Sequence, residues 1–152
     1  MWSTVKRSML LRIVSLRLLL LDIRARAYVA LAARRGEGSA RAAREADVYL
    51  SRIEREKTIW MSPQAALCRA GLAELAGRRE EALSRLADAA RGFEAASMPL
   101  QAAVARTCRG RLLGGSEGDS LRAAAEAWMT EHGIVNGDKM IRMYAPGFDA
   151  KD

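Results

Sequence analysis

The sequence contains few aromatic residues, prolines, cysteines and histidines. Aromatic residues make up 5% of the 152 residues, and there are three prolines, two cysteines and one histidine. The cysteines, Cys68 and Cys108, form neither a disulfide framework nor the spacing of a metal site, so no metal or cofactor is expected. Both lie in stretches rich in Ala, Leu and Arg, where a free cysteine is usually a small buried hydrophobe. This favours a reduced, cytoplasmic protein.

The residue patterns of common enzymes are also missing. Neither a G-x-x-x-x-G-K-[ST] loop nor a Gly-rich kinase loop occurs. The segment 114–118, Gly-Gly-Ser-Glu-Gly, lacks the lysine and the preceding strand, and we interpret it as a turn between helices. His132, next to Gly133, suits the end of a helix and would be the only imidazole base for either cysteine. Glu80 and Glu81 fit the first turn of a helix. We therefore predict no enzyme.

A long uncharged hydrophobic run is absent as well. The apolar stretch 9–23 is interrupted by Arg12 and Arg17, and Asp22 lies near its end. A membrane-spanning helix needs about 20 mainly apolar residues, and a charge at the bilayer centre costs roughly 2.5–3.5 kcal/mol on insertion scales. Neither a membrane span nor a secretion signal is expected.

The residues that are abundant, Ala, Leu, Arg and Glu, are strong helix formers. Their pattern predicts an all-α protein with helical hairpins over about 5–57, 62–96 and 98–132 and a short helix over 138–144. We expect one domain over 1–148 and a tail over 149–152. The first helix is apolar on most of its circumference, which predicts packing on several sides inside an array.

Glycines recur at a regular distance between these helices. Gly38, Gly77 and Gly115 are 39 and 38 residues apart, and each separates two helices of similar length. A helix–turn–helix unit repeated at such a period is typical of an α-solenoid, whose units stack to bury the face that each hairpin cannot bury alone. About three units fit in this chain.

The second unit carries a residue pattern of its own, formed by Ala70, Gly77, Ala82, Leu86 and Ala89. It resembles the tetratricopeptide repeat, in which small residues allow close contact between the two helices of a hairpin. The resemblance covers residues 62–97 well and the flanking units loosely. The hallmark aromatic residues of that family are missing, and the spacing exceeds its usual length. The expected fold is thus a degenerate, tetratricopeptide-like α-solenoid.

The C-terminal residues carry a second resemblance. Its elements are Trp128-Met129, Gly133-Ile134, Met140, Arg142-Met143 and the run 145–148, Ala-Pro-Gly-Phe. They resemble the extreme C-terminal helical region of large bacterial, especially myxobacterial-type, serine/threonine kinases with an attached NTPase module. In such proteins the catalytic parts lie upstream, and the tail is an interaction region. Trp128, Met140 and Met143 are interpreted as a cap on the exposed end of the array, with an adaptable docking patch as the alternative.

The charge is distributed unevenly. Residues 1–60 hold 13 basic and 6 acidic residues, a balance of +7, whereas residues 117–152 hold 4 and 7, a balance of −3. Four arginines lie on the first helices of successive hairpins: Arg69, Arg106, Arg109 and Arg111. They form either a basic groove for an acidic peptide or a set of scattered solvated side chains.

These patterns favour a non-catalytic protein–protein interaction or scaffolding module. The resemblance implies that it is the regulatory tail of a bacterial kinase/NTPase signalling protein, or that it acts in trans with one. The alternative is a basic helical nucleic-acid-binding protein. Dispersed arginines, and the absence of aromatic residues interleaved with them, argue against that alternative.

Overall fold

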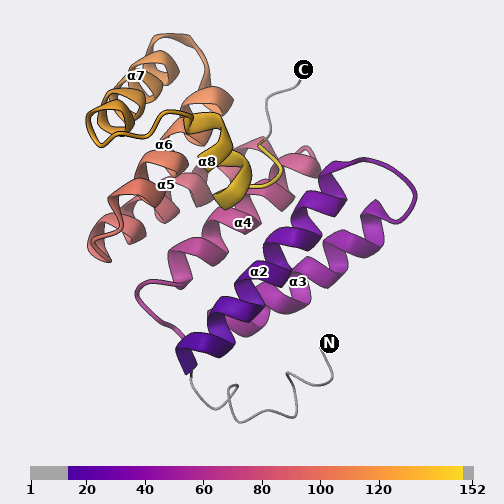
Figure 1. Ribbon diagram of the computed structural model, residues 1–152. Coiled ribbons are helices and arrows are strands. Elements are labelled where there is room, and N and C mark those ends of the chain that lie inside the picture. Colours follow the sequence, from indigo (N-terminus) through magenta and orange to yellow (C-terminus); the bar gives the residue numbers. More distant parts are fainter. Residues whose placement is uncertain (1–13, 149–152) are drawn as a thin grey trace.

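The computed structural model describes residues 14–148, and within that range the chain forms seven α-helices and no strand (Figure 1). An all-α protein is therefore confirmed. The helices are α2 Val14–Ala33, α3 Ser39–Arg55, α4 Ser62–Leu75, α5 Arg79–Ala95, α6 Pro99–Leu113, α7 Gly115–Glu131 and α8 Gly137–Tyr144. The part of the first predicted helix before residue 14, and the predicted tail 149–152, lie outside the described residues.

The helices pair in sequence order. Helices α2 and α3, α4 and α5, and α6 and α7 form three hairpins through their most extensive contacts. Helix α4 also packs on α2 and α3, and α6 packs on α5, so the hairpins stack in a row. The short turns make neighbouring helices antiparallel. Helices α4 and α6 are buried on most of their circumference, because each has neighbours on several sides.

Glycines with left-handed backbone occupy the turn of each hairpin. Gly38 and Gly77 have φ values of 91° and 73°. In the third hairpin the turn is shorter than predicted, because Gly114, with φ of 68°, ends α6 and also precedes the first residue of α7. Gly115 is the first residue of α7, with φ of 60°. The interpretation of 114–118 as an interhelical turn is thus wrong for all but its first residue.

The reason lies in a close crossing of α6 and α7. A Cβ atom at Gly118 would stand 2.4 Å from the carbonyl oxygen of Gly110, and one at Gly110 would stand 2.6 Å from the carbonyl oxygen of Gly118. Only two glycines facing each other permit this backbone approach. Gly118 is therefore a buried residue of α7 in contact with Gly110, although the local sequence predicts a loop there.

The core consists of two clusters that meet at α4. The first hairpin and α4 share one cluster, which includes Leu18, Leu50 and Cys68. The second cluster extends from α4 to the C-terminal residues and is rich in alanine. Ala82 and Leu86, singled out by the repeat pattern, are completely buried in α5. The small side chain of Ala82 lets the helix axes come close, and the larger one of Leu86 fills the space between the helices.

The sequence predicts that the C-terminal helix covers the exposed end of the array. In the structure this helix does not lie beyond α7. Helix α8 packs on α6, its last turn contacts α2 and α4, and the residues after it contact α4, so that this segment runs across the first helices of the hairpins (Figure 1). We call residues 137–148 the crossing segment. The outward face of α7 remains exposed, and its residues are small or polar: Ser116, Ser120, Ala123, Ala127 and Thr130. Such a face needs no cap.

Candidate functional site

The nucleophiles and the imidazole do not come together. Cys68 and Cys108 are completely buried in the core, and burial raises the pKa of the Cys68 thiol to about 12. His132 is exposed at the end of α7, where its ring stacks on Trp128 with centroids 4.0 Å apart. Among residues 14–148 no three His, Cys, Asp or Glu side chains are grouped to hold a metal ion. No helix in that range is long and apolar enough to cross a membrane.

The four arginines predicted to line a groove are directed to four different helices. Their acidic partners are Asp47 and Glu54 in α3 for Arg69, Glu94 in α5 for Arg106, Glu117 in α7 for Arg109 and Asp138 in α8 for Arg111. Each guanidinium thus joins two helices of the same chain. The sequence places these residues on first helices correctly, but it does not reveal the acidic partners, which lie 8 to 27 residues away.

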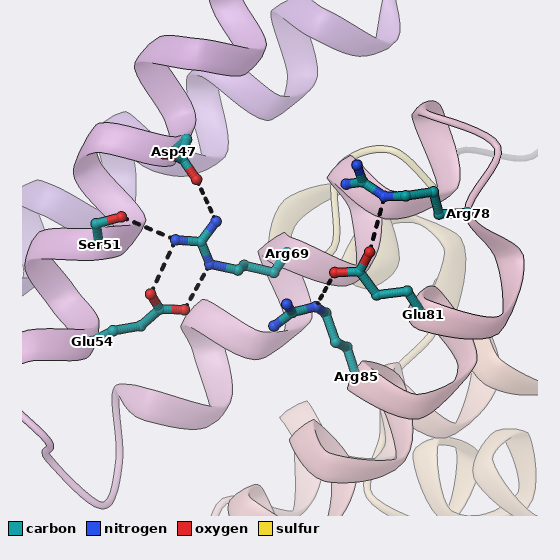
Figure 2. Close-up of polar contacts among 7 residues, drawn as sticks. All are labelled: Asp47, Ser51, Glu54, Arg69, Arg78, Glu81 and Arg85. Atoms are coloured by element: carbon teal, nitrogen blue, oxygen red, sulfur yellow. Dashed lines mark hydrogen bonds and ion pairs between the residues drawn. The ribbon is translucent and has the colours of Figure 1, made fainter.

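Arg69 makes the most extensive of these networks (Figure 2). Its guanidinium donates to both carboxylate oxygens of Glu54, at 2.7 and 3.0 Å, and to the hydroxyl of Ser51 at 3.0 Å. It also donates to the carboxylate of Asp47. These hydrogen bonds, above all those to Glu54, raise the pKa of Arg69 further above its ordinary value. Because a bidentate pair of this kind has defined geometry, Arg69 fixes the second hairpin against the first.

A second group in Figure 2 is local to one helix. Glu81 accepts from Arg85 at 2.7 Å, one turn further along α5, and pairs with Arg78 at 2.9 Å. The hydrogen bond from Arg85 is the largest cause that lowers the pKa of Glu81. Pairs at this spacing support the helix by a few tenths of a kcal/mol. The group explains the acidic residues early in α5 and does not indicate a catalytic carboxylate.

The crossing segment is held by side chains from two other helices. Arg26 of α2 donates to the carbonyl oxygen of Met143 at 2.7 Å, and Gln64 of α4 donates to that of Tyr144 at 3.1 Å. Arg26 is itself bound by Asp22, whose carboxylate accepts from Nε at 2.9 Å. Asp22 is 5% exposed. Its burial raises its pKa, and Arg26 partly offsets that rise.

The same segment approaches the backbone of α4. Gly147 lies against Gly71, and Ala145 and Pro146 are buried. Met140 is half-buried and Met143 is exposed, so these two of the predicted cap residues lie over the first helices, whereas Trp128, the third, is part of α7. This face of the hairpins, which a solenoid commonly uses for ligands, is therefore occupied by the chain's own C-terminal residues.

The uncovered apolar surface lies on α2. The prediction that this helix packs on several sides is wrong, because only the face with Leu18, Ala25 and Val29 is buried. On the opposite face Leu19 is 45% and Ile23 is 52% exposed. We call this face the α2 row; it comprises Leu16, Leu19, Leu20, Ile23, Ala27 and Ala30, which are half-buried or exposed. Among residues 14–148, the hairpin of α2 and α3 lies at one end of the row of hairpins (Figure 1).

An aromatic stack borders the α2 row. Tyr28 of α2 and Tyr49 of α3 are parallel, with ring centroids 5.7 Å apart. The guanidinium of Arg24 lies 4.9 Å from the ring of Tyr49, and that of Arg52 lies 5.8 Å from the same ring. Cation–π contacts of this kind hold both arginines against their own chain.

A cavity of about 570 Å³ continues the α2 row at the turn between α2 and α3. It is open to solvent, and Tyr28, Leu31, Arg34, Arg41 and Glu45 are among its lining residues. The lining residues include the basic Arg34 and Arg41 and the acidic Glu45. The apolar Leu31 is 46% exposed. The cavity extends the apolar end surface towards the hairpin loop and adds polar groups at its rim.

Helix α3 carries a basic row that the sequence analysis missed. Arg41, Arg44, Arg52 and Arg55 are exposed, and their spacing places them on one side of the helix with Val48. The signal was present as the recurrence of arginine every three, eight and three residues. The predicted groove arginines of the later hairpins also recur at short intervals in the sequence, although they have acidic partners within the chain.

No known protein-family model, curated protein or solved structure matches the chain. In residues 14–148 the crossing segment covers the face formed by the first helices, and the predicted groove arginines are paired with acidic residues of the same chain. The α2 row is an apolar surface that stays uncovered in this range.

Proposed function

We propose that the chain is a non-catalytic protein–protein interaction module built on a tetratricopeptide-like repeat. The stacked hairpins, the turn glycines about 39 residues apart and the small residues within the second hairpin support this proposal. Such stacks present extended surfaces and bind through them. The two buried, free cysteines support a cytoplasmic location, where thiols stay reduced.

We infer further that the module belongs to a bacterial kinase/NTPase signalling system, as its regulatory tail or as a partner in trans. The resemblance of residues 121–148 to the tails of such kinases supports this step. The residues that carry it form the end of α7, helix α8 and the rest of the crossing segment, which are neighbours in space. In this proposal they complete the module, and the partner binds elsewhere.

The observation that carries the proposal is the α2 row. Exposed apolar patches of this kind mark interaction surfaces. Fully burying a Leu or Ile side chain contributes roughly 1.5–3 kcal/mol, so that covering the exposed halves of Leu19 and Ile23 alone gives a partner helix a clear gain. Several side chains at helical spacing make the row suited to another helix more than to a small ligand.

Affinity capture with paired variants tests this proposal. The whole chain is used as bait in an extract of the source organism, beside Ile23→Glu in the α2 row and Ala127→Glu on the exposed face of α7. We expect the wild type and Ala127→Glu to retain the same kinase- or NTPase-type proteins, and Ile23→Glu to lose them. Equal capture by all three chains would contradict an interaction surface on α2.

A second candidate, nucleic-acid binding, is favoured by one observation, the basic row on α3. Duplex DNA carries closely spaced phosphates, and each phosphate neutralised by an arginine adds about 0.9 to the slope of log affinity against log salt. Anisotropy titrations of a labelled duplex over a range of salt concentrations test it. A steep slope that Arg44→Glu reduces would support this candidate. No binding at physiological salt would eliminate it.

A further inference from the structure

The α2 row has the spacing of a helix–helix seam. Leu16, Leu20, Ile23, Ala27 and Ala30 follow one another at intervals of four, three, four and three residues. Apolar residues repeating every 3.5 residues on average let two helices pack side chains between each other along their whole length. Ile23, in the middle of this seam, is 52% exposed.

We propose that a second copy of this chain covers the row, with the two α2 helices antiparallel and Ile23 opposite its own counterpart on a twofold axis. This inference rests on the proposed function and names the occupant of the same surface: the kinase- or NTPase-type proteins captured through the row would be those that carry a copy of this module as their tail. Closed twofold dimers are the commonest assemblies of identical chains, and they pair a surface with itself.

The distribution of side-chain sizes selects the antiparallel direction. Leu16 and Ala30 each lie seven residues from Ile23, and Leu19 and Ala27 each lie four residues from it. In an antiparallel pair centred on Ile23, Leu16 of one copy therefore faces Ala30 of the other, and Leu19 faces Ala27. Leu20 lies opposite Arg26, whose guanidinium is paired with Asp22 of its own chain. A parallel pair would set Leu against Leu at one end and leave a gap between alanines at the other. Large facing small fills the interface at the density of a protein core.

The charged residues beside the row already have partners in their own chain. Arg17 pairs with Glu56, Arg26 pairs with Asp22, and Arg24 lies over the rings of Tyr28 and Tyr49. The row itself holds no charged residue between positions 16 and 30. A second copy therefore brings no unpaired charge into the centre of the interface, where it would be costly.

The opposite end of the array is a poor match for the row. The outward face of α7 presents Ser116, Ser120 and Thr130 beside its alanines, and acidic residues such as Glu131 lie along it. Stacking that end on α2 of the next copy would bury hydroxyl and carboxylate groups against leucines, at the cost of their hydration. Pairing α2 with α2 buries apolar surface on both sides.

Sedimentation equilibrium of the full chain across the micromolar range tests the dimer. We expect the wild type and Ala127→Glu to form dimers reversibly, and Ile23→Glu to be monomeric with an unchanged helical circular dichroism spectrum. Added salt should strengthen the dimer, because each chain carries a net charge of +7 and salt screens the repulsion between the two copies. If instead a nucleic acid bound to the basic row held two copies together, added salt would weaken their association.

Cysteine pairs test the register. Cys68 and Cys108 are completely buried, so that an introduced exposed cysteine dominates oxidation. Ile23→Cys should form a disulfide-linked dimer by itself. Leu16→Cys and Ala30→Cys should cross-link when mixed but not alone, because positions 16 and 30 are about 21 Å apart along the helix and a disulfide requires Cα atoms within roughly 7 Å. Cross-links of Leu16→Cys with itself would overturn the antiparallel register.

The results also separate this inference from the proposed function. If the wild type is monomeric throughout and Ile23→Glu still abolishes capture of a partner, the α2 row binds another protein and the dimer is wrong. If Ile23→Glu changes neither association nor capture, both proposals fail. Dimers that persist in Ile23→Glu would place the interface elsewhere and overturn the inference.

Discussion

Gly71 of α4 and Pro146 of the crossing segment are in backbone contact. A Cβ atom at residue 71 would lie 2.5 Å from the carbonyl oxygen of Pro146, and a Cβ atom at residue 147 would lie 3.2 Å from the α-carbon of Gly71. The contact joins positions 75 residues apart in sequence. Because the obstructing atom belongs to the backbone, a side chain at residue 71 cannot be accommodated by rotating a neighbour.

Replacing Gly71 by Ala should therefore displace the crossing segment from α4. Overpacking of a tight contact costs roughly 1–3 kcal/mol, and we expect a loss of that size in the free energy of unfolding, measured by urea titration. Gly36→Ala is the matched control, since a Cβ atom there meets nothing within 4 Å. Equal stability of the two variants would mean that the crossing segment is not held against α4.

Removing the guanidinium of Arg69 should loosen the first hairpin from the second. Arg69→Ala breaks the bidentate pair with Glu54 and the contacts with Ser51 and Asp47. Hydrogen bonds to charged groups contribute roughly 1.5–3 kcal/mol, and because Glu54 is partly solvated we expect a loss of about 1–3 kcal/mol in urea unfolding.

Arg91→Ala is the control for that variant. Arg91 pairs with Asp88 on the surface of α5, and both side chains are more than half exposed. Exposed pairs of this kind contribute about 0–1 kcal/mol. If Arg69→Ala costs no more than Arg91→Ala, the network between α3 and α4 makes no contribution to the stacking of the hairpins.

Cys68 should be unreactive in the native protein. Its side chain is completely buried, and its raised pKa of about 12 leaves little thiolate at neutral pH. Titration with a thiol reagent should label no cysteine in buffer and both cysteines in denaturant. In a Cys108→Ala background, Gly71→Ala should speed the labelling of Cys68, because Gln64 contacts both the Cys68 sulfur and Tyr144. An unchanged labelling rate would mean that the crossing segment does not control access to Cys68.

The contribution of Asp22 to stability should fall as the pH rises, whereas that of a carboxylate whose pKa is lowered by an ion pair rises with pH. Burial raises its pKa in the folded state above the unfolded value of about 3.9. The folded state then holds the proton more tightly, so that the contribution of Asp22 to stability is lost as the pH rises from that value through the raised one. The stability of Asp22→Asn relative to the wild type should thus increase with pH over this window.

Urea unfolding of both chains at several pH values measures that difference. The comparison removes the effect of the other carboxylates, which are common to both. If the relative stability of Asp22→Asn instead falls as the pH rises, the ion pair with Arg26 outweighs burial and the pKa of Asp22 is lowered.

The helices and their order could be predicted from local features of the sequence. Pro63 and Pro99 lie in the first turns of α4 and α6, and Gly38 and Gly77 have the left-handed backbone expected between helices. These signals act over a few residues. Local reasoning failed at Gly118, because its role depends on a glycine of another helix, Gly110.

The surfaces could not be predicted in the same way. The partners of Arg69 and Arg111, and the path of the crossing segment over α2 and α4, are set by contacts between residues far apart in the chain. The apolar residues around α2 are visible in the sequence, but the exposure of Leu19 and Ile23 depends on how α3 and α4 pack against the helix. The spacing of apolar residues indicates which face of a helix is hydrophobic, but it does not show which residues pack against that face.

The path of the crossing segment has a consequence for how the protein unfolds. Stacked repeats contact only their neighbours, and such arrays can lose their units one after another. Here Arg26 in the first hairpin is hydrogen-bonded to Met143, 117 residues later, so that the last residues of the array are joined to its first helix. The chain is closed on itself, and melting of any hairpin releases this link. We therefore expect a single cooperative transition, and slower folding than an open stack of equal length.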